Sequence, residues 1–225
     1  MEKTLTSGYQ PNMTEDQLNA NYDYFIELLK LKFTGDRLTG LLKMYNEENL
    51  GIQLCTAPAS GKADFHYAFP GGYLLHVLNV EKASRGVEKV FSAMGGTIDY
   101  TDSERLFAAL HHDLGKLGDT EFGAYYTPQT DEWRQKKLGE IYGHNKVSPP
   151  WDVTDRTLYI LQYYGIKVTW KETLAIKLSD GMFPDKNGPY FRSLDGLKTS
   201  LCNIIHWADW MSCRAEKSQW EETTK

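Results

Sequence analysis

The chain is poor in cysteine, has no long apolar run and carries no excess of positive charge. Its three cysteines, Cys55, Cys202 and Cys213, are widely spaced and form no Cys-x-x-Cys pair. This pattern argues against a disulfide framework or a cysteine-based zinc site, and it is typical of a reducing compartment. No apolar run is long enough to span a membrane, and the polar N-terminus has no hydrophobic signal region. We therefore predict a cytoplasmic protein that does not interact with membranes.

The composition nevertheless predicts a well-packed globular chain. Hydrophobic residues make up 41% of the 225 residues and aromatic residues 13%, which is enough for a core and unlike a disordered chain. The formal net charge of −5 gives no strong overall attraction to nucleic acid, although it leaves room for a local basic groove.

The apolar periodicity divides the chain into three parts. We expect an N-terminal arm with a helical extension at 1–55, a core at 56–216 and a polar tail at 217–225. In the extension, Thr14 to Gln17 form a capping box, Gly35 ends the first helix and Asp36 can cap a second. We interpret these helices as an extra packing layer, with a subunit contact in a homo-oligomer as the alternative.

The main chemical signal is an apolar helix that ends in two histidines, an aspartate, a glycine and a lysine. Asp102 or Ser103 can cap this helix, so His112 and Asp113 fall in its last turn. Imidazole and carboxylate groups are ligands for divalent metals, and Lys116 lies on the same face, where it could hold a phosphate oxygen. An isolated His-Asp pair is more often a structural hydrogen bond than a metal site, so the choice between the two depends on the rest of the chain.

Two further residues complete a pattern. His76 lies on an earlier apolar helix, and Asp209 lies on a late helix between two tryptophans. Together with His112-Asp113 they resemble the signature of the HD-domain metal phosphohydrolases. The resemblance implies that His76, His112, Asp113 and Asp209 hold one divalent transition metal, and that the ligand is His112 rather than His111. His and carboxylate ligands suit Mn, Fe, Co, Ni or Zn.

The segment before His76 strengthens the resemblance. Its run from Phe65 through Gly71-Gly72 to His76 is similar to the lead-in of one HD branch, which includes exoribonucleases and other nucleotide or nucleic-acid hydrolases. Two glycines permit a sharp turn and a close backbone approach at the start of the helix. His66 is either a substrate-facing residue or an ordinary loop histidine, and we retain it as a substrate-binding candidate.

A segment of different character follows the His-Asp helix. The ranges 122–126 and 132–136 flank a polar stretch, which predicts a small β-hairpin insert. Arg134 lies on it and is a candidate for binding phosphate, although a solvated basic face is the default. His144 matches a further histidine of many HD proteins and is a candidate catalytic residue.

The helix that ends at Ser179-Asp180 departs from the pattern of HD proteins with two metals. Those proteins have another histidine in this region, whereas here the corresponding positions hold Lys177, Ser179 and Asp180. The difference favours a mononuclear site. Asp180 remains a candidate for binding a substrate hydroxyl, and Tyr190-Phe191 either stack on a base or close the core.

The resemblance implies an all-α HD-domain helical bundle with a small β-hairpin insert and an N-terminal helical extension. It also implies hydrolysis of a phosphoester or phosphoanhydride, most simply in a nucleotide or deoxynucleotide. Asp113 would accept the proton of the attacking water, Lys116 would stabilise the phosphoryl oxygens, and His144 or His66 would protonate the leaving group. The alternatives are a nuclease for single strands, a non-catalytic nucleotide-binding module and a di-iron oxygenase.

Overall fold

The computed structural model describes residues 13–46, 50–193 and 197–223. In these ranges the protein is mostly helical, with two pairs of short antiparallel strands, which confirms the expected helical fold with a small strand insert. The α-helices are α1 (Glu15–Lys32), α2 (Gly35–Met44), α3 (Gly51–Thr56), α4 (Gly72–Ala93), α5 (Asp102–His111), α6 (Glu132–Leu138), α7 (Val153–Tyr163), α8 (Trp170–Lys177), α9 (Gly188–Arg192) and α10 (Leu201–Thr223). The 3₁₀ turns are η1 (Leu114–Lys116) and η2 (Asp185–Asn187), and the strands are β1 (Gly118–Asp119), β2 (Gly123–Ala124), β3 (Tyr126–Pro128) and β4 (Tyr142–His144). No described helix is both long and apolar enough to cross a membrane.

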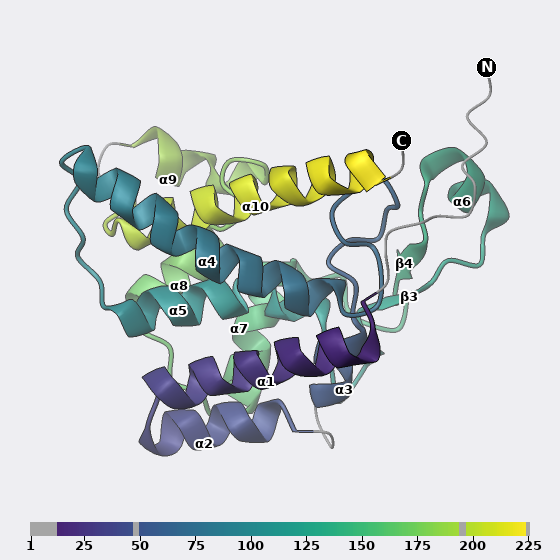
Figure 1. Ribbon diagram of the computed structural model, residues 1–225, viewed down its shortest axis with the longest axis horizontal. Helices are drawn as coiled ribbons and strands as arrows, with labels where there is room; N and C mark the ends of the chain where they lie inside the picture. The colour runs from purple at the N-terminus through teal and green to yellow at the C-terminus, as the bar shows by residue number, and fades with distance from the viewer. Residues whose placement is uncertain (1–12, 47–49, 194–196, 224–225) are drawn as a thin grey trace.

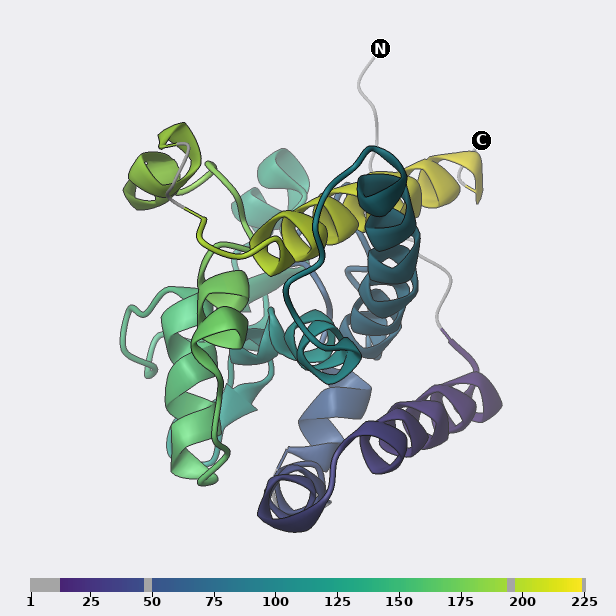
Figure 2. The same ribbon diagram turned by 90° about the vertical axis from the view of Figure 1, so that its left-hand side faces the viewer.

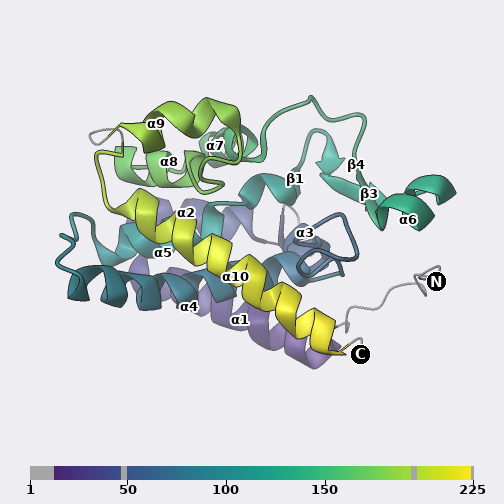
Figure 3. The same cartoon turned by 90° about the horizontal axis from the view of Figure 1, so that it is seen from above.

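Helices α4, α5 and α10 form the centre of the molecule. Helix α10 packs along α4, and α5 lies between α4 and α8 (Figures 1 and 3). Helices α1 and α2 cover the side of α4 and α5 that lies opposite α10 (Figure 2). One hydrophobic cluster joins α1, α2, α3 and α7 to this centre, and a second joins α8 and α10 to it. Helices α4 and α5 contribute to both clusters, so side chains at their meeting point are held from two sides.

The N-terminal helices pack onto the core as a layer. Phe25 and Leu29 of α1 are fully buried in the same cluster as Leu74 of α4. The capping box at Thr14 is confirmed, since its side chain and that of Gln17 each bond the other's backbone amide. The predicted role of Gly35 is wrong, because α1 ends at Lys32 and Gly35 begins α2.

The predicted hairpin between 122–126 and 132–136 is wrong. Strand β3 instead pairs with β4, and the chain between them contains helix α6 (Figure 3). Asp131 caps α6 by accepting hydrogen bonds from the amides two and three residues later, and Gly139 ends it with a φ of +64°. Asp131, one of the polar residues that suggested a hairpin turn, is therefore a helix cap, because Asp serves equally well in both settings.

Two other helix boundaries differ from the expectation. The N-cap of α5 is Thr101, which forms a capping box with Glu104, rather than Asp102 or Ser103. Helix α10 continues to Thr223, so the expected tail at 217–225 is helical as far as it is described. Just before this segment, Glu216 is buried against α4 although the surrounding sequence is polar.

Candidate metal centre

Two glycines place His76 at the start of α4. Gly71 is the N-cap of the helix and has a φ of +83°, in the left-handed region that favours glycine. A Cβ atom at Gly72 would overlap the carbonyl oxygen of Tyr67, so the backbone approaches there as closely as the sequence predicted. His76 lies one turn further along and is fully buried.

The end of α5 places the His-Asp pair. His112 is the C-cap of α5 and Asp113 follows it, one or two residues beyond the expected last turn. The Nδ1 atom of His112 lies 2.9 Å from the carbonyl oxygen of Ala109, so its Nε2 atom is free to face α4 and α10. His111 instead stacks on Phe107 at a centroid distance of 4.3 Å, and burial lowers its pKa to about 3.

Four predicted ligands converge between α4, α5 and α10. The Nε2 atom of His76 lies 3.3 Å from Oδ1 of Asp209 and 3.7 Å from Oδ2 of Asp113. The Nε2 atom of His112 lies 3.6 Å from Oδ1 of Asp209 and 3.5 Å from Oδ2 of Asp113. His76 and His112 are buried, and the side chain of Asp209 is 15% exposed, so the group opens to solvent on the α10 side.

The donor atoms fit a divalent ion. Among the described residues, the Nε2 atoms of His76 and His112 are buried and make no well-aligned hydrogen bond, although both face the carboxylates of Asp113 and Asp209. Ligand atoms about 2.1 Å from one ion lie about 3.0 Å apart in octahedral and about 3.4 Å in tetrahedral geometry. The distances of 3.3 to 3.7 Å are close to these values. His76, His112 and Asp209 could therefore hold an ion, with Asp113 beside them.

The electrostatics of the group also favour a cation. Burial opposes the charged forms of both histidines, but the surrounding carboxylates outweigh it and raise the pKa of His76 to about 10 and that of His112 in the same direction. Burial likewise opposes the charges of Asp113 and Asp209, yet their cationic neighbours hold both pKa values low. Ionised carboxylates next to imidazole nitrogens attract a proton or a metal ion to the same place.

Sequence reasoning did not identify Glu216. Its carboxylate lies 3.0 Å from Nδ1 of His76 and accepts a hydrogen bond from Asn79 at 2.9 Å. Such a partner fixes the orientation of a ligating imidazole and raises its basicity. The available signal was spacing, because Glu216 follows Asp209 by seven residues and so lies on the same face of α10.

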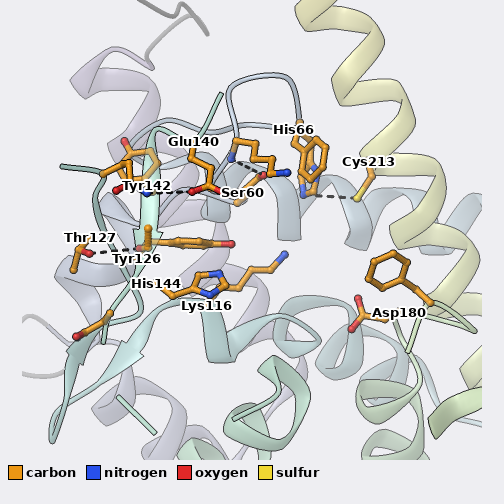
Figure 4. Close-up of a pocket in the computed structure, with 18 of the residues that line it drawn as sticks. Ser60, His66, Lys116, Tyr126, Thr127, Glu140, Tyr142, His144, Asp180 and Cys213 are labelled. Atoms are coloured by element: carbon orange, nitrogen blue, oxygen red, sulfur yellow. Dashed lines mark hydrogen bonds between the residues drawn. The ribbon is translucent and has the colours of Figure 1, made fainter. Parts of the chain in front are cut away.

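A cleft of about 1690 Å³ opens beside the group. Lys116, His66 and Tyr126 direct their polar ends into it, and Asp180 faces them from the other side (Figure 4). Lys116 lies 2.5 Å from Oδ2 of Asp113, which raises the pKa of the lysine despite its burial, so it stays protonated. The cleft therefore combines a fixed cation with the candidate metal ligands.

The other predicted site residues lie further from the ligands. His144 lies on β4, is exposed and packs 4.9 Å from the ring of Tyr125. Arg134 lines the cleft but is paired with Glu140 at 2.7 Å. Both belong to the segment that contains β3, α6 and β4.

The aromatic residues of the cleft are not those singled out from the sequence. Tyr190 and Phe191 pack against the second hydrophobic cluster, so they close the core. Phe183, Trp207 and Trp210 line the cleft instead and are 93%, 47% and 45% exposed. Trp207 and Trp210 flank Asp209 in sequence, so one turn of α10 presents a ligand and two exposed rings.

No family model matches the chain, and neither a curated protein nor a solved structure does.

Proposed function

We propose that the protein is a metal-dependent phosphohydrolase of the HD type that acts on a nucleotide. The observation that carries the proposal is the buried group of His76, His112 and Asp209. Each imidazole Nε2 atom faces carboxylate oxygens of Asp113 and Asp209 at 3.3 to 3.7 Å, and neither makes a well-aligned hydrogen bond among the described residues. This group lies beside a cleft that Asp209 and Lys116 line. A purely structural His–Asp network would be expected to align these hydrogen bonds.

His76, His112 and Asp209 would hold the ion, with Asp113 as a further carboxylate. A divalent ion bound there supplies Lewis acidity towards a phosphoryl oxygen and lowers the pKa of a water. Asp113 accepts the proton from the attacking water. Lys116 contacts the phosphoryl oxygens and stabilises the negative charge that develops on them.

Asp180 is a candidate proton donor for the leaving group. Its partly desolvated position and the nearby charge of Asp113 raise its pKa, which is the direction that a proton donor requires. Partial desolvation lowers the pKa of His66 and that of His144, so the surroundings of these two expected donors do not favour the protonated form that a donor needs. Asp180 also lines the cleft, opposite Lys116 and Tyr126 (Figure 4).

The lining of the cleft supports a nucleotide as the substrate. Stacking of a base on an aromatic side chain contributes about 1–3 kcal/mol, and Trp207 and Trp210 are exposed within reach of the cleft. Lysine and arginine side chains that can bind phosphates also line it, namely Lys62, Lys116, Lys146 and Arg214. The expected basic face on 132–136 is less suited to a nucleic-acid strand, because Arg134 and Lys136 are paired with Glu140 and Glu132.

The test is a panel assay with the purified protein. It offers dNTPs, NTPs, monophosphates, cyclic nucleotides and short single strands, each with Mn, Co, Ni, Zn or Mg, and identifies products by mass. Release of phosphate, pyrophosphate or triphosphate from a free nucleotide supports the proposal. Shortened strands with free nucleotides untouched would make the protein a nuclease, and binding without turnover under any metal would make it a binding module.

Three variants test the assigned residues. His112→Ala and Asp113→Ala should abolish hydrolysis and keep most of the helix content, and full activity in either would refute the site. Lys116→Ala should lower turnover by about 10²–10³ and change metal affinity less, because it stabilises charge on the substrate. Lys177→Ala is the matched control, since Lys177 pairs with Asp155 outside the cleft. Equal losses of turnover and metal affinity would give Lys116 a structural role.

A further inference from the structure

A second group of metal-ligand atoms adjoins the first. His66, His76 and Cys213 each offer one atom, and these atoms lie within 4.8 Å of one another. The Nε2 atom of His66 is 3.7 Å from the sulfur of Cys213 (Figure 4), and that sulfur is 3.4 Å from Oδ1 of Asp209. The two groups therefore meet at His76 and at the carboxylate of Asp209.

The fold, rather than a sequence motif, creates this group. Cys213 follows Asp209 by four residues and projects from the same face of α10. His66 comes from the loop that leads into α4, whose position depends on the turn at Gly71. Its ring lies 4.8 Å from the ring of His76, measured between centroids.

The spacing of the nitrogen and the sulfur fits coordination. An ion with a metal–sulfur distance of about 2.3 Å and a metal–nitrogen distance of about 2.1 Å places these ligands about 3.6 Å apart at a tetrahedral angle. The distance between His66 Nε2 and Cys213 Sγ is 3.7 Å. A hydrogen bond between a thiol and an imidazole has a similar length, so a measurement specific for thiolate coordination separates the two.

We propose that His66, His76 and Cys213 form a thiolate-containing position for a soft divalent ion, and that this position excludes an ion held by His76, His112 and Asp209. Glu216 contacts Nδ1 of His76, which leaves only Nε2 for either ion. One nitrogen lone pair binds one metal, so the two positions compete. Binding of the soft ion releases the thiol proton of Cys213 and the Nε2 proton of His76 to solvent.

The two positions differ in the ions they select. Thiolate is a soft ligand that favours ions such as Cd²⁺ and Zn²⁺, whereas carboxylates suit Mn²⁺. A soft ion bound beside His66 would therefore remove His76 from the carboxylate position. This inference does not depend on hydrolysis, because it concerns only which ion the protein binds and where.

The test is a titration of the metal-free, full-length protein with Cd²⁺, followed by the near-ultraviolet absorption of cadmium–thiolate coordination. The band should saturate at one equivalent of Cd²⁺ in the wild type and be absent in Cys213→Ser. Cys202→Ser is the control and should keep the band, since Cys202 is buried in the second hydrophobic cluster. Excess Mn²⁺ should weaken the apparent affinity for Cd²⁺.

Three outcomes would overturn the proposal: no thiolate band in the wild type, a band that persists in Cys213→Ser, or Cd²⁺ and Mn²⁺ bound together at one equivalent each. His66→Gln guards against a folding defect in the cysteine variant. It should lower the affinity for Cd²⁺ by at least about tenfold and leave that for Mn²⁺ nearly unchanged. Because no substrate is present, absence of hydrolysis in the panel assay would leave these results untouched.

Discussion

Replacing Glu216 by glutamine tests whether this residue tunes the metal centre. The carboxylate is buried, lies 3.0 Å from Nδ1 of His76 and accepts a hydrogen bond from Asn79. Glutamine keeps the shape but removes the charge. Loss of such a partner lowers metal affinity about 10–100-fold, which corresponds to about 1.4–2.7 kcal/mol of binding free energy.

The pH dependence gives this prediction its sign. The pKa of His76 is raised to about 10, so in the metal-free protein at neutral pH an ion must displace a proton. Affinity in the wild type should therefore rise with pH and level off near 10. Glu216→Gln lowers the pKa of His76, so a proton competes less with the metal ion in the variant than in the wild type. The advantage of the wild type in metal affinity should therefore be smallest at low pH and widen as pH rises.

Calorimetric titration with Mn²⁺ at several pH values measures this gap. Glu221→Gln is the control, because Glu221 is an exposed acid on the same helix. Wild-type affinity in Glu216→Gln, or a gap that is the same at every pH, would refute the role given to Glu216. A purely structural role would lower the melting temperature without changing the pH profile.

Three further changes test the fold around the site. Gly72→Ala should lower the free energy of unfolding by about 1–3 kcal/mol, because its Cβ would overlap the backbone of Tyr67. Gly86→Ala in the same helix has open space and should raise the free energy of unfolding by about 0.5–1 kcal/mol. Equal effects of the two substitutions in urea unfolding would contradict this prediction. Tyr73→Phe removes a buried hydroxyl that has no partner among the described residues and should raise stability by about 1 kcal/mol at neutral pH. Burial raises the pKa of Tyr73, so above about pH 10 only the phenol of the unfolded chain ionises and the wild type should lose stability as pH rises. Tyr73→Phe should lose less stability over the same range. Identical alkaline unfolding curves for the two proteins would contradict this prediction. Chelation of a bound ion should lower the melting temperature by about 5–10 °C when the ion had been present at about 100 times its dissociation constant, and an unchanged scan would mean that no ion is bound.

Local sequence patterns located the helices that carry the candidate ligands. The capping box at Thr14 was predicted correctly, because a cap involves side chains only three residues apart. The same local reading was wrong at Asp131, where a helix cap was interpreted as a hairpin turn. Asp stabilises both, and only the pairing of β3 with β4, which depends on residues 14 to 18 positions apart, decides between them.

The sequence by itself determined the donor atoms that the site contains. His76 and Asp209 stand on apolar helices whose periodicity points both of them inwards, and His112-Asp113 directly follow the last residue of α5. Only the tertiary structure decided which further side chains contact these ligands. The contact of Glu216 with His76 and that of Cys213 with His66 depend on how α10 crosses α4 and on the loop before α4. The residues of each pair are about 140 positions apart in the sequence. Periodicity within a helix shows on which face of the helix a residue lies, but it does not show which other element packs against that face.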